Sequence, residues 1–270
     1  MIKLIAGLVS NDELILKRFN GISLGKITHL PDYNIRPGNH TFFLSSMKRH
    51  EFMIFRYGMA PSGTKEDRII FEAPVEAPWR TIHDEHILKK DIIGSPDFRK
   101  QIRGQRGLMP VDYFILESDH EPYVVFMRDR RRPFALGCIW DAWKKNILDD
   151  LTYGFAILTV PAYGTFRKIG IKRMPLIISE HDYREWVNPD PTIMGKTDLM
   201  DYYPEKYLNA FPIAREILTS TENSKSLVNP VGEMLFKDEK KDLGLIQYKR
   251  RKGKEFDESK PTLGERLGLK

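Results

Sequence analysis

The sequence predicts an α+β fold, mainly antiparallel β-sheet with a few short helices, and three observations lead to this prediction. Short apolar runs rich in aromatic and β-branched residues recur along the chain, separated by clusters of turn-forming residues. The chain has 270 residues, of which 41% are hydrophobic, and can therefore bury a sizeable core. Three apolar runs between Arg106 and Trp140, at residues 111–116, 123–127 and 134–140, predict a β-meander at the centre of the fold.

The other predicted elements flank this meander. Further apolar runs predict strands over residues 2–9, 42–45, 52–57, 69–71 and 155–160. A serine in the N-cap position marks the start of three short helices. These helices are predicted over residues 10–21, 95–104 and 179–187, with Ser10, Ser95 and Ser179 as the caps and Glu13 completing a capping box with Ser10.

Charge divides the chain into two predicted parts. The formal net charge is +6, but residues 237–270 alone hold eleven Lys and Arg against seven Asp and Glu. Apolar residues also become sparse there, without a helical or strand period. We therefore expect a folded domain over residues 1–236 and a basic, mobile tail over residues 237–270.

The cysteine count and the hydropathy narrow the class of protein. The one cysteine, Cys138, excludes an intramolecular disulfide and a cysteine-based zinc site, as expected in a reducing compartment. No apolar run approaches the roughly 20 residues of a membrane span, and the first residues lack a signal-peptide pattern. We expect a cytoplasmic protein without a membrane, metal or cofactor partner.

Two local patterns resemble catalytic or metal-binding motifs. Residues 21–25 match the G-x-S-x-G nucleophile elbow, but a predicted helix precedes them where the elbow needs a strand. We interpret these glycines as the end of that helix. His83 and His86 have the spacing of neighbouring helical turns, yet no further His or Cys nearby completes a metal site. A solvated loop or helix end is the simpler interpretation.

Two further features concern charge and reactivity. Residues 128–132 read Arg-Asp-Arg-Arg-Arg and form a predicted hairpin tip that could meet phosphates, but a solvated turn is the favoured interpretation. Cys138 lies in an apolar strand, where a free cysteine behaves as a small buried hydrophobe rather than as a nucleophile.

Seven segments, in the same order over residues 1–231, resemble motifs of the SRAP family, the SOS-response-associated peptidase-like proteins. Members of this family bind single-stranded DNA and cross-link to abasic sites. The resemblance implies a barrel-like, mainly antiparallel fold. The segments read YNIRP at 33–37, YGMAP at 57–61, APVE at 73–76, RGLMPVDYF at 106–114, PFALGCIWD at 133–141, ILT at 157–159 with KRMP at 172–175, and FPI at 211–213.

The resemblance also implies which chemistry to look for. The family's nucleophile is a cysteine directly after the initiator methionine. Its amine condenses with the sugar aldehyde of an abasic site, and its thiol then closes a thiazolidine ring. This reaction needs proximity and a proton donor more than strong activation. A glutamate, a histidine and an asparagine in the family motifs supply the proton transfer and the positioning.

This chain departs from the family pattern at each of those positions. Ile2 stands at the cysteine position, Glu72 at the asparagine, Leu116 at the glutamate and Ile171 at the histidine. Glu117 is one residue further along, but a shift of one residue in a strand turns the side chain to the opposite face. Two residues of the family's DNA-contacting set are retained, Thr159 and Arg173.

We therefore expect a diverged member that lacks the family's catalytic residues and binds single-stranded or abasic DNA without the cross-link. The basic tail is expected to add sequence-independent contacts. Two alternatives remain open. One is a weak lyase, in which the N-terminal amine or Lys3 forms a Schiff base with the abasic aldehyde. The other is a protein-interaction module that docks through residues 237–270.

Overall fold

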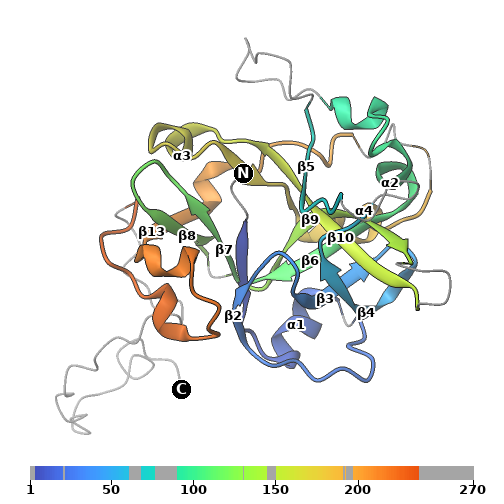
Figure 1. Ribbon diagram of the computed structural model, residues 1–270, viewed down its shortest axis with the longest axis horizontal. Helices are drawn as coiled ribbons and strands as arrows, with labels where there is room; N and C mark the ends of the chain where they lie inside the picture. Colours follow the sequence, from blue (N-terminus) through green and yellow to red (C-terminus); the bar gives the residue numbers. More distant parts are fainter. Residues whose placement is uncertain are drawn as a thin grey trace, which may run out of the picture. The chain divides into compact units, whose positions relative to one another are not determined.

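The computed structural model describes residues 4–20, 22–60, 68–76, 90–129, 131–144, 150–190, 192 and 197–236. Strands dominate these residues, and the helices are short (Figure 1). The strands are β1 (Ile5–Leu8), β2 (Asp32–Ile35), β3 (His40–Ser45), β4 (Lys48–Tyr57), β5 (Glu72–Pro74), β6 (Arg106–Val111), β7 (Tyr113–Glu117), β8 (Pro122–Met127), β9 (Phe134–Trp143), β10 (Thr152–Pro161), β11 (Arg173–Pro175), β12 (Ile177–Ile178) and β13 (Leu208–Pro212). The α-helices are α1 (Asp12–Arg18), α2 (Arg99–Gly104), α3 (Gly164–Lys168) and α4 (Tyr183–Trp186).

The strands form two sheets, one of which closes into a barrel. In the closed sheet β10, β4, β3, β6 and β9 follow one another, and β9 pairs back onto β10. Strands β5, β11 and β12 extend its margins. The second sheet has the order β13-β8-β7-β1-β2, with every pair antiparallel. Within the closed sheet only β10 with β4 and β5 runs parallel. The predicted α+β class with mainly antiparallel strands is confirmed.

The predicted β-meander is wrong in its last pairing. Strands β7 and β8 pair as expected, but β9 pairs with β6, β10 and β12 in the barrel, while β13 takes the place beside β8. The burial pattern explains the difference. Strand β9 is buried on both faces for its first eight residues, so it needs neighbours and cover on both sides, which the closed barrel supplies. Residue 111 also belongs to β6 rather than to the following strand.

Aromatic rings fill the barrel interior. Phe43 stacks on Phe55 and on Phe155, each with ring centroids 4.7 Å apart, and Tyr57 stacks on Phe155 at 5.3 Å. These rings come from β3, β4 and β10, which confirms the predicted strands at 42–45, 52–57 and 155–160. Of the run at 69–71, only Ile70 makes a bridge, to Met59, and the strand itself begins at residue 72.

The helix starts differ from the predicted caps. Asn11 caps α1, with its Oδ1 accepting from the Leu14 N–H at 3.0 Å, and the hydroxyl of Ser10 donates elsewhere. Asn20, with φ of 51°, follows the helix in the left-handed conformation that the glycines were expected to supply. Helix α2 ends at Gly104 as predicted but begins only after a turn closed on the Ser95 carbonyl. Ser179 precedes a 3₁₀ turn that leads into α4 without a side-chain cap.

Hydrogen bonds from a buried arginine hold α2 and α4 against the barrel. Arg106, in β6, is 1% exposed and donates to the carbonyls of Ile102 at 2.6 Å and Trp186 at 2.9 Å, and also to those of Arg103, Asn188 and Asp190. Burial lowers the pKa of this guanidinium to about 10. The five carbonyls replace the water that the charged group loses.

No helix in the described ranges is long and apolar enough to cross a membrane.

A buried carboxylate sits where the chain passes from the barrel to the second sheet. Asp112, between β6 and β7, is 2% exposed. Its Oδ2 accepts from the N–H groups of Val9 and Ser10, each at 2.6 Å, and its Oδ1 accepts from the Ser10 hydroxyl. The Asp112 N–H donates to the Gly7 carbonyl at 2.7 Å. This group therefore fixes the end of β1 against the joint between the two sheets.

We predict that Asp112→Asn destabilises the protein. The amide has one acceptor oxygen in place of two, so at least one buried donor loses its partner, at a cost of about 3 kcal/mol. Urea unfolding of the variant beside the exposed control Asp150→Asn measures this loss. Equal unfolding midpoints for the two variants would show that the joint does not depend on the carboxylate.

Candidate functional site

The structure brings together Thr159 and Arg173, the two residues predicted from the resemblance to contact DNA, around a partly buried ion pair with Glu76. Arg173, at the start of β11, donates from Nε to the Thr159 Oγ1 at 3.0 Å and from Nη2 to the Thr159 carbonyl at 2.9 Å. Both ends of its guanidinium also contact the carboxylate of Glu76. Glu76 and Thr159 are buried, but the Arg173 side chain is 34% exposed. Arg173 can therefore reach a ligand, whereas Thr159 positions it.

A second carboxylate, that of Glu72 in β5, lies beside Leu4, the residue before β1. Its Oε1 accepts from the Leu4 N–H at 3.0 Å, while the Tyr57 hydroxyl donates to the Leu4 carbonyl at 3.2 Å. Burial raises the pKa of Glu72, against the opposing effects of the Leu4 hydrogen bond and the charge of Arg173. A carboxyl with a raised pKa can exchange a proton closer to neutral pH than an ordinary glutamate. Sequence reasoning assigned this position only by resemblance to the family's asparagine.

Apolar side chains occupy the two positions that were assigned by resemblance to the family's glutamate and histidine. Leu116 and Ile171 are each 2% exposed and belong to the hydrophobic core. Leu116 follows Ile115, which pairs with Ile5 in the neighbouring strand β1. A leucine and an isoleucine can neither donate nor accept a proton, so these positions supply packing in place of acid–base chemistry.

An open pocket of about 1070 Å³ adjoins this cluster, and Ile171 forms part of its wall. The pocket lies between α3, the residues that follow it, and the turn between β7 and β8. A Cβ atom added to Gly170, whose φ is +89°, would lie 2.6 Å from the Asp119 Oδ2, so the two segments meet closely. The charged lining residues are Arg167, Lys168, Lys172 and Asp119, three cations against one carboxylate.

Tyr202 lines the pocket and is also close enough to the Arg173–Glu76 ion pair to be influenced by its charges. Its pKa is raised by burial first, then by the nearby charge of Glu76, while Arg173 acts in the opposite direction. Sequence reasoning found neither Tyr202 nor the pocket cations. Arg167 and Lys168 end a helix of five residues, which is too short for a recognisable charge period, and Lys172 follows it. Tyr202 lies some thirty residues further along the chain.

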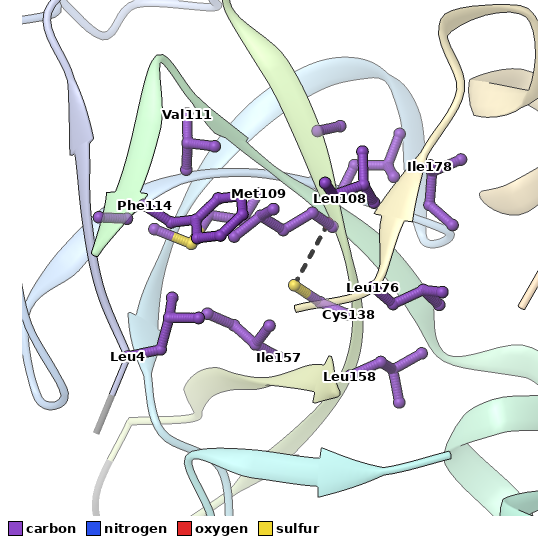
Figure 2. Close-up of a cluster of buried hydrophobic side chains, with 14 of the residues drawn as sticks. Leu4, Leu108, Met109, Val111, Phe114, Cys138, Ile157, Leu158, Leu176 and Ile178 are labelled. Atoms are coloured by element: carbon purple, nitrogen blue, oxygen red, sulfur yellow. Dashed lines mark hydrogen bonds between the residues drawn. The ribbon is translucent and has the colours of Figure 1, made fainter. Parts of the chain in front are cut away.

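Cys138 is confirmed as a core residue. It is 0% exposed in β9, and burial raises the pKa of its thiol well above the ordinary value. Figure 2 shows its sulfur surrounded by apolar side chains, including Leu108 and Leu176, with Leu4 facing Ile157 nearby. A thiol in this position is neither ionised nor accessible, so it is not available as a nucleophile.

The remaining motifs contribute no reactive group in the described ranges. The exposed Ser23 accepts a hydrogen bond from the Gly25 N–H at 3.0 Å and has no strand directly before it. The predicted hairpin tip at 128–132 is a connection between the two sheets, where Arg128 stacks on Phe236 and Arg131 pairs with Asp129. No group of three or more His, Cys, Asp or Glu that could hold a metal occurs among the described residues.

Several predicted features lie outside the described residues. They are Ile2 and Lys3, the pair His83 and His86, and the tail over residues 237–270. The division of the chain at residue 236 and the roles assigned to these residues therefore stay predictions.

We predict that Glu72→Gln changes how stability depends on pH. Glutamine keeps an acceptor for the Leu4 N–H but removes the buried charge. Because the folded pKa of Glu72 is raised, its favourable contribution is complete below the unfolded pKa and is lost as pH rises through the folded pKa. The unfolding free energy of the variant relative to the parent should therefore increase between pH 4 and pH 7 in urea titrations. A relative decrease over that range would contradict the burial of an unfavourable charge.

The sequence matches a family of known proteins. The model of the SRAP family, SOS response associated peptidase, matches residues 7–220. The abasic site processing protein YobE of Bacillus subtilis (strain 168) is 24% identical over 192 residues, which cover 68% of this chain and 81% of the relative. The abasic site processing protein YoqW of the same organism is 23% identical over 230 residues, or 82% and 96% of the two chains.

Solved structures show the same fold. A protein from Bacteroides thetaiotaomicron superposes with a TM-score of 0.67 at 16% identity, covering 84% of this chain and 98% of its own. A protein from Bordetella bronchiseptica gives a TM-score of 0.61 at 18% identity, covering 78% and 99%. The motifs, the fold and the family model agree, and the chain belongs to the SRAP family.

Proposed function

We propose that this protein binds single-stranded DNA, including strands that carry an abasic site, without forming the thiazolidine cross-link. The observation that carries the proposal is the open basic pocket beside Ile171 and the Arg173 cluster. A surface that is locally positive and concave attracts phosphates and releases their counterions on binding. In the described part of the chain, neither Lys168 nor Lys172 forms an ion pair that would neutralise it.

The absence of cross-linking follows from the place of the cysteine. A thiazolidine needs an amine and a thiol on neighbouring carbons of one residue, so the cysteine must carry a free α-amine. Cys138 is the only cysteine of this sequence, and its nitrogen is part of a peptide bond inside β9. Its sulfur is also buried. We therefore expect complexes that dissociate on denaturation.

The link to abasic DNA rests on the relatives and on the retained residues. The similar proteins YobE and YoqW are both named abasic site processing proteins. Arg173 and Thr159 stand where the family contacts DNA, and Arg173 remains one-third exposed. An abasic nucleotide has no base to stack, so its sugar and phosphates are accessible to such a guanidinium. This supports a role for the Arg173 cluster in holding the lesion or its flanking phosphate.

Glu72 favours a second candidate, a weak abasic-site lyase. Its carboxyl, with a raised pKa, lies beside Leu4 at the start of β1. A primary amine from Lys3 or the N-terminus would condense with the abasic aldehyde, releasing water and giving an imine that Glu72 could protonate. Borohydride reduces such an imine to a stable amine. No trapped protein–DNA band at any excess of protein would exclude this candidate.

We predict that the double variant Lys168→Glu/Lys172→Glu weakens binding of a single-stranded oligonucleotide. Loss of two phosphate contacts should reduce affinity by about tenfold or more near 100 mM salt and lower the slope of log affinity against log salt by about 1.4. Fluorescence anisotropy over a salt series measures both quantities.

The matched control is Lys17→Glu/Lys26→Glu, which changes the net charge equally. Both control lysines are exposed, one in α1 and one in the loop after it, and α1 lies far from α3 (Figure 1). An equal loss of affinity in both double variants would show that DNA responds to net charge alone and would remove the pocket from the proposal.

A further inference from the structure

Tyrosines continue from the basic pocket along the protein surface. Tyr202, Tyr203 and Tyr207 belong to the segment that leads into β13, and Tyr163 lies at the start of α3. We call these four residues the tyrosine row. All four residues are at least partly exposed, and Tyr207 is 39% exposed. Tyr163, Tyr202 and Tyr203 pack part of their surface against the core, and the remainder is accessible to a ligand.

Contacts between the tyrosines hold the row in place. The rings of Tyr163 and Tyr202 are 4.7 Å apart between centroids, and those of Tyr203 and Tyr207 are 6.1 Å apart. The Tyr163 hydroxyl donates to the Tyr203 carbonyl, which joins the two pairs. The rings are therefore arranged before any ligand binds, so little side-chain entropy is lost on stacking.

Cations accompany the rings at both ends. At the pocket end, Tyr163 and Tyr202 share the lining with Arg167, Lys168 and Lys172. At the other end, the Lys206 ammonium lies 5.0 Å from the Tyr207 ring centroid, and the Arg131 guanidinium, which also pairs with Asp129, lies 5.9 Å from it. Alternation of aromatic rings with cations is the arrangement by which proteins bind single-stranded nucleic acid, the rings stacking on bases and the cations meeting phosphates.

We propose that the tyrosine row stacks on successive bases of the strand that flanks the pocket, with Tyr202 nearest the pocket and Tyr207 farthest from it. This inference rests on the proposed binding of single-stranded DNA in the pocket and adds a direction to it. The strand leaves the pocket along the segment before β13 and not across the barrel. Stacking is indifferent to base identity, so the row extends the footprint without selecting a sequence.

The test compares two oligonucleotides of twelve nucleotides, one of thymidines and one of base-free tetrahydrofuran nucleotides with the same phosphates. The parent protein should bind the thymidine strand more tightly than the base-free strand by roughly tenfold, as expected for stacking on one or two rings. Tyr202→Ala/Tyr207→Ala should lose this preference. Tyr207→Ala alone, at a residue outside the pocket lining, should lose part of it while its affinity for the base-free strand and its salt slope stay unchanged. Tyr202→Phe/Tyr207→Phe should keep the preference, because phenylalanine retains the ring.

The control is Tyr33→Ala, a partly exposed tyrosine in β2 at the opposite edge of the five-stranded sheet from β13. Urea unfolding confirms that each variant is folded. A preference that survives Tyr202→Ala/Tyr207→Ala, or that falls equally with Tyr33→Ala, would overturn the tyrosine row while leaving the pocket intact. If the parent binds neither strand at low salt, both this inference and the proposed function fail.

Discussion

The hydrogen bonds of Asp112 determine how the two sheets meet. The carboxylate lies at the one residue between β6 of the barrel and β7 of the second sheet, and it holds the N–H groups that end β1. Strand β1 thereby lies beside β7, with Leu4 next to Glu72 of β5. The candidate site is built from strands of both sheets, so its geometry depends on this joint. Burial raises the pKa of Asp112, although its hydrogen bonds act in the opposite direction. Because three donors depend on its two carboxylate oxygens, few other side chains could replace it.

The candidate site combines apolar core residues with one partly exposed ion pair. Leu116 and Ile171 fill positions where the family resemblance implies a glutamate and a histidine, and both are core residues. Arg173 nevertheless keeps a precise set of partners in Glu76 and Thr159. Glu76 offsets the charge of Arg173 and fixes its orientation, while about a third of the Arg173 side chain stays exposed. This geometry is compatible with the anion binding that we propose.

Local sequence patterns predicted where the strands lie better than they predicted which strands pair. The runs at 42–45, 52–57 and 155–160 are strands because their alternation and aromatic content act locally, whereas the pairing of β9 depends on closure of the barrel, which no local pattern reports. The same distinction holds for the site. Resemblance located Thr159 and Arg173, but the pocket depends on a turn, a short helix and a distant tyrosine that only tertiary structure brings together.

The central claim is that this protein binds single-stranded DNA non-covalently. The most direct test mixes the full chain with a fluorescent single-stranded oligonucleotide, intact or with one abasic site. Anisotropy over a salt series is read first, and a denaturing gel follows. We expect salt-sensitive binding of both strands and no band of protein–DNA adduct on the gel. An adduct with the abasic strand that survives denaturation without borohydride would contradict the claim.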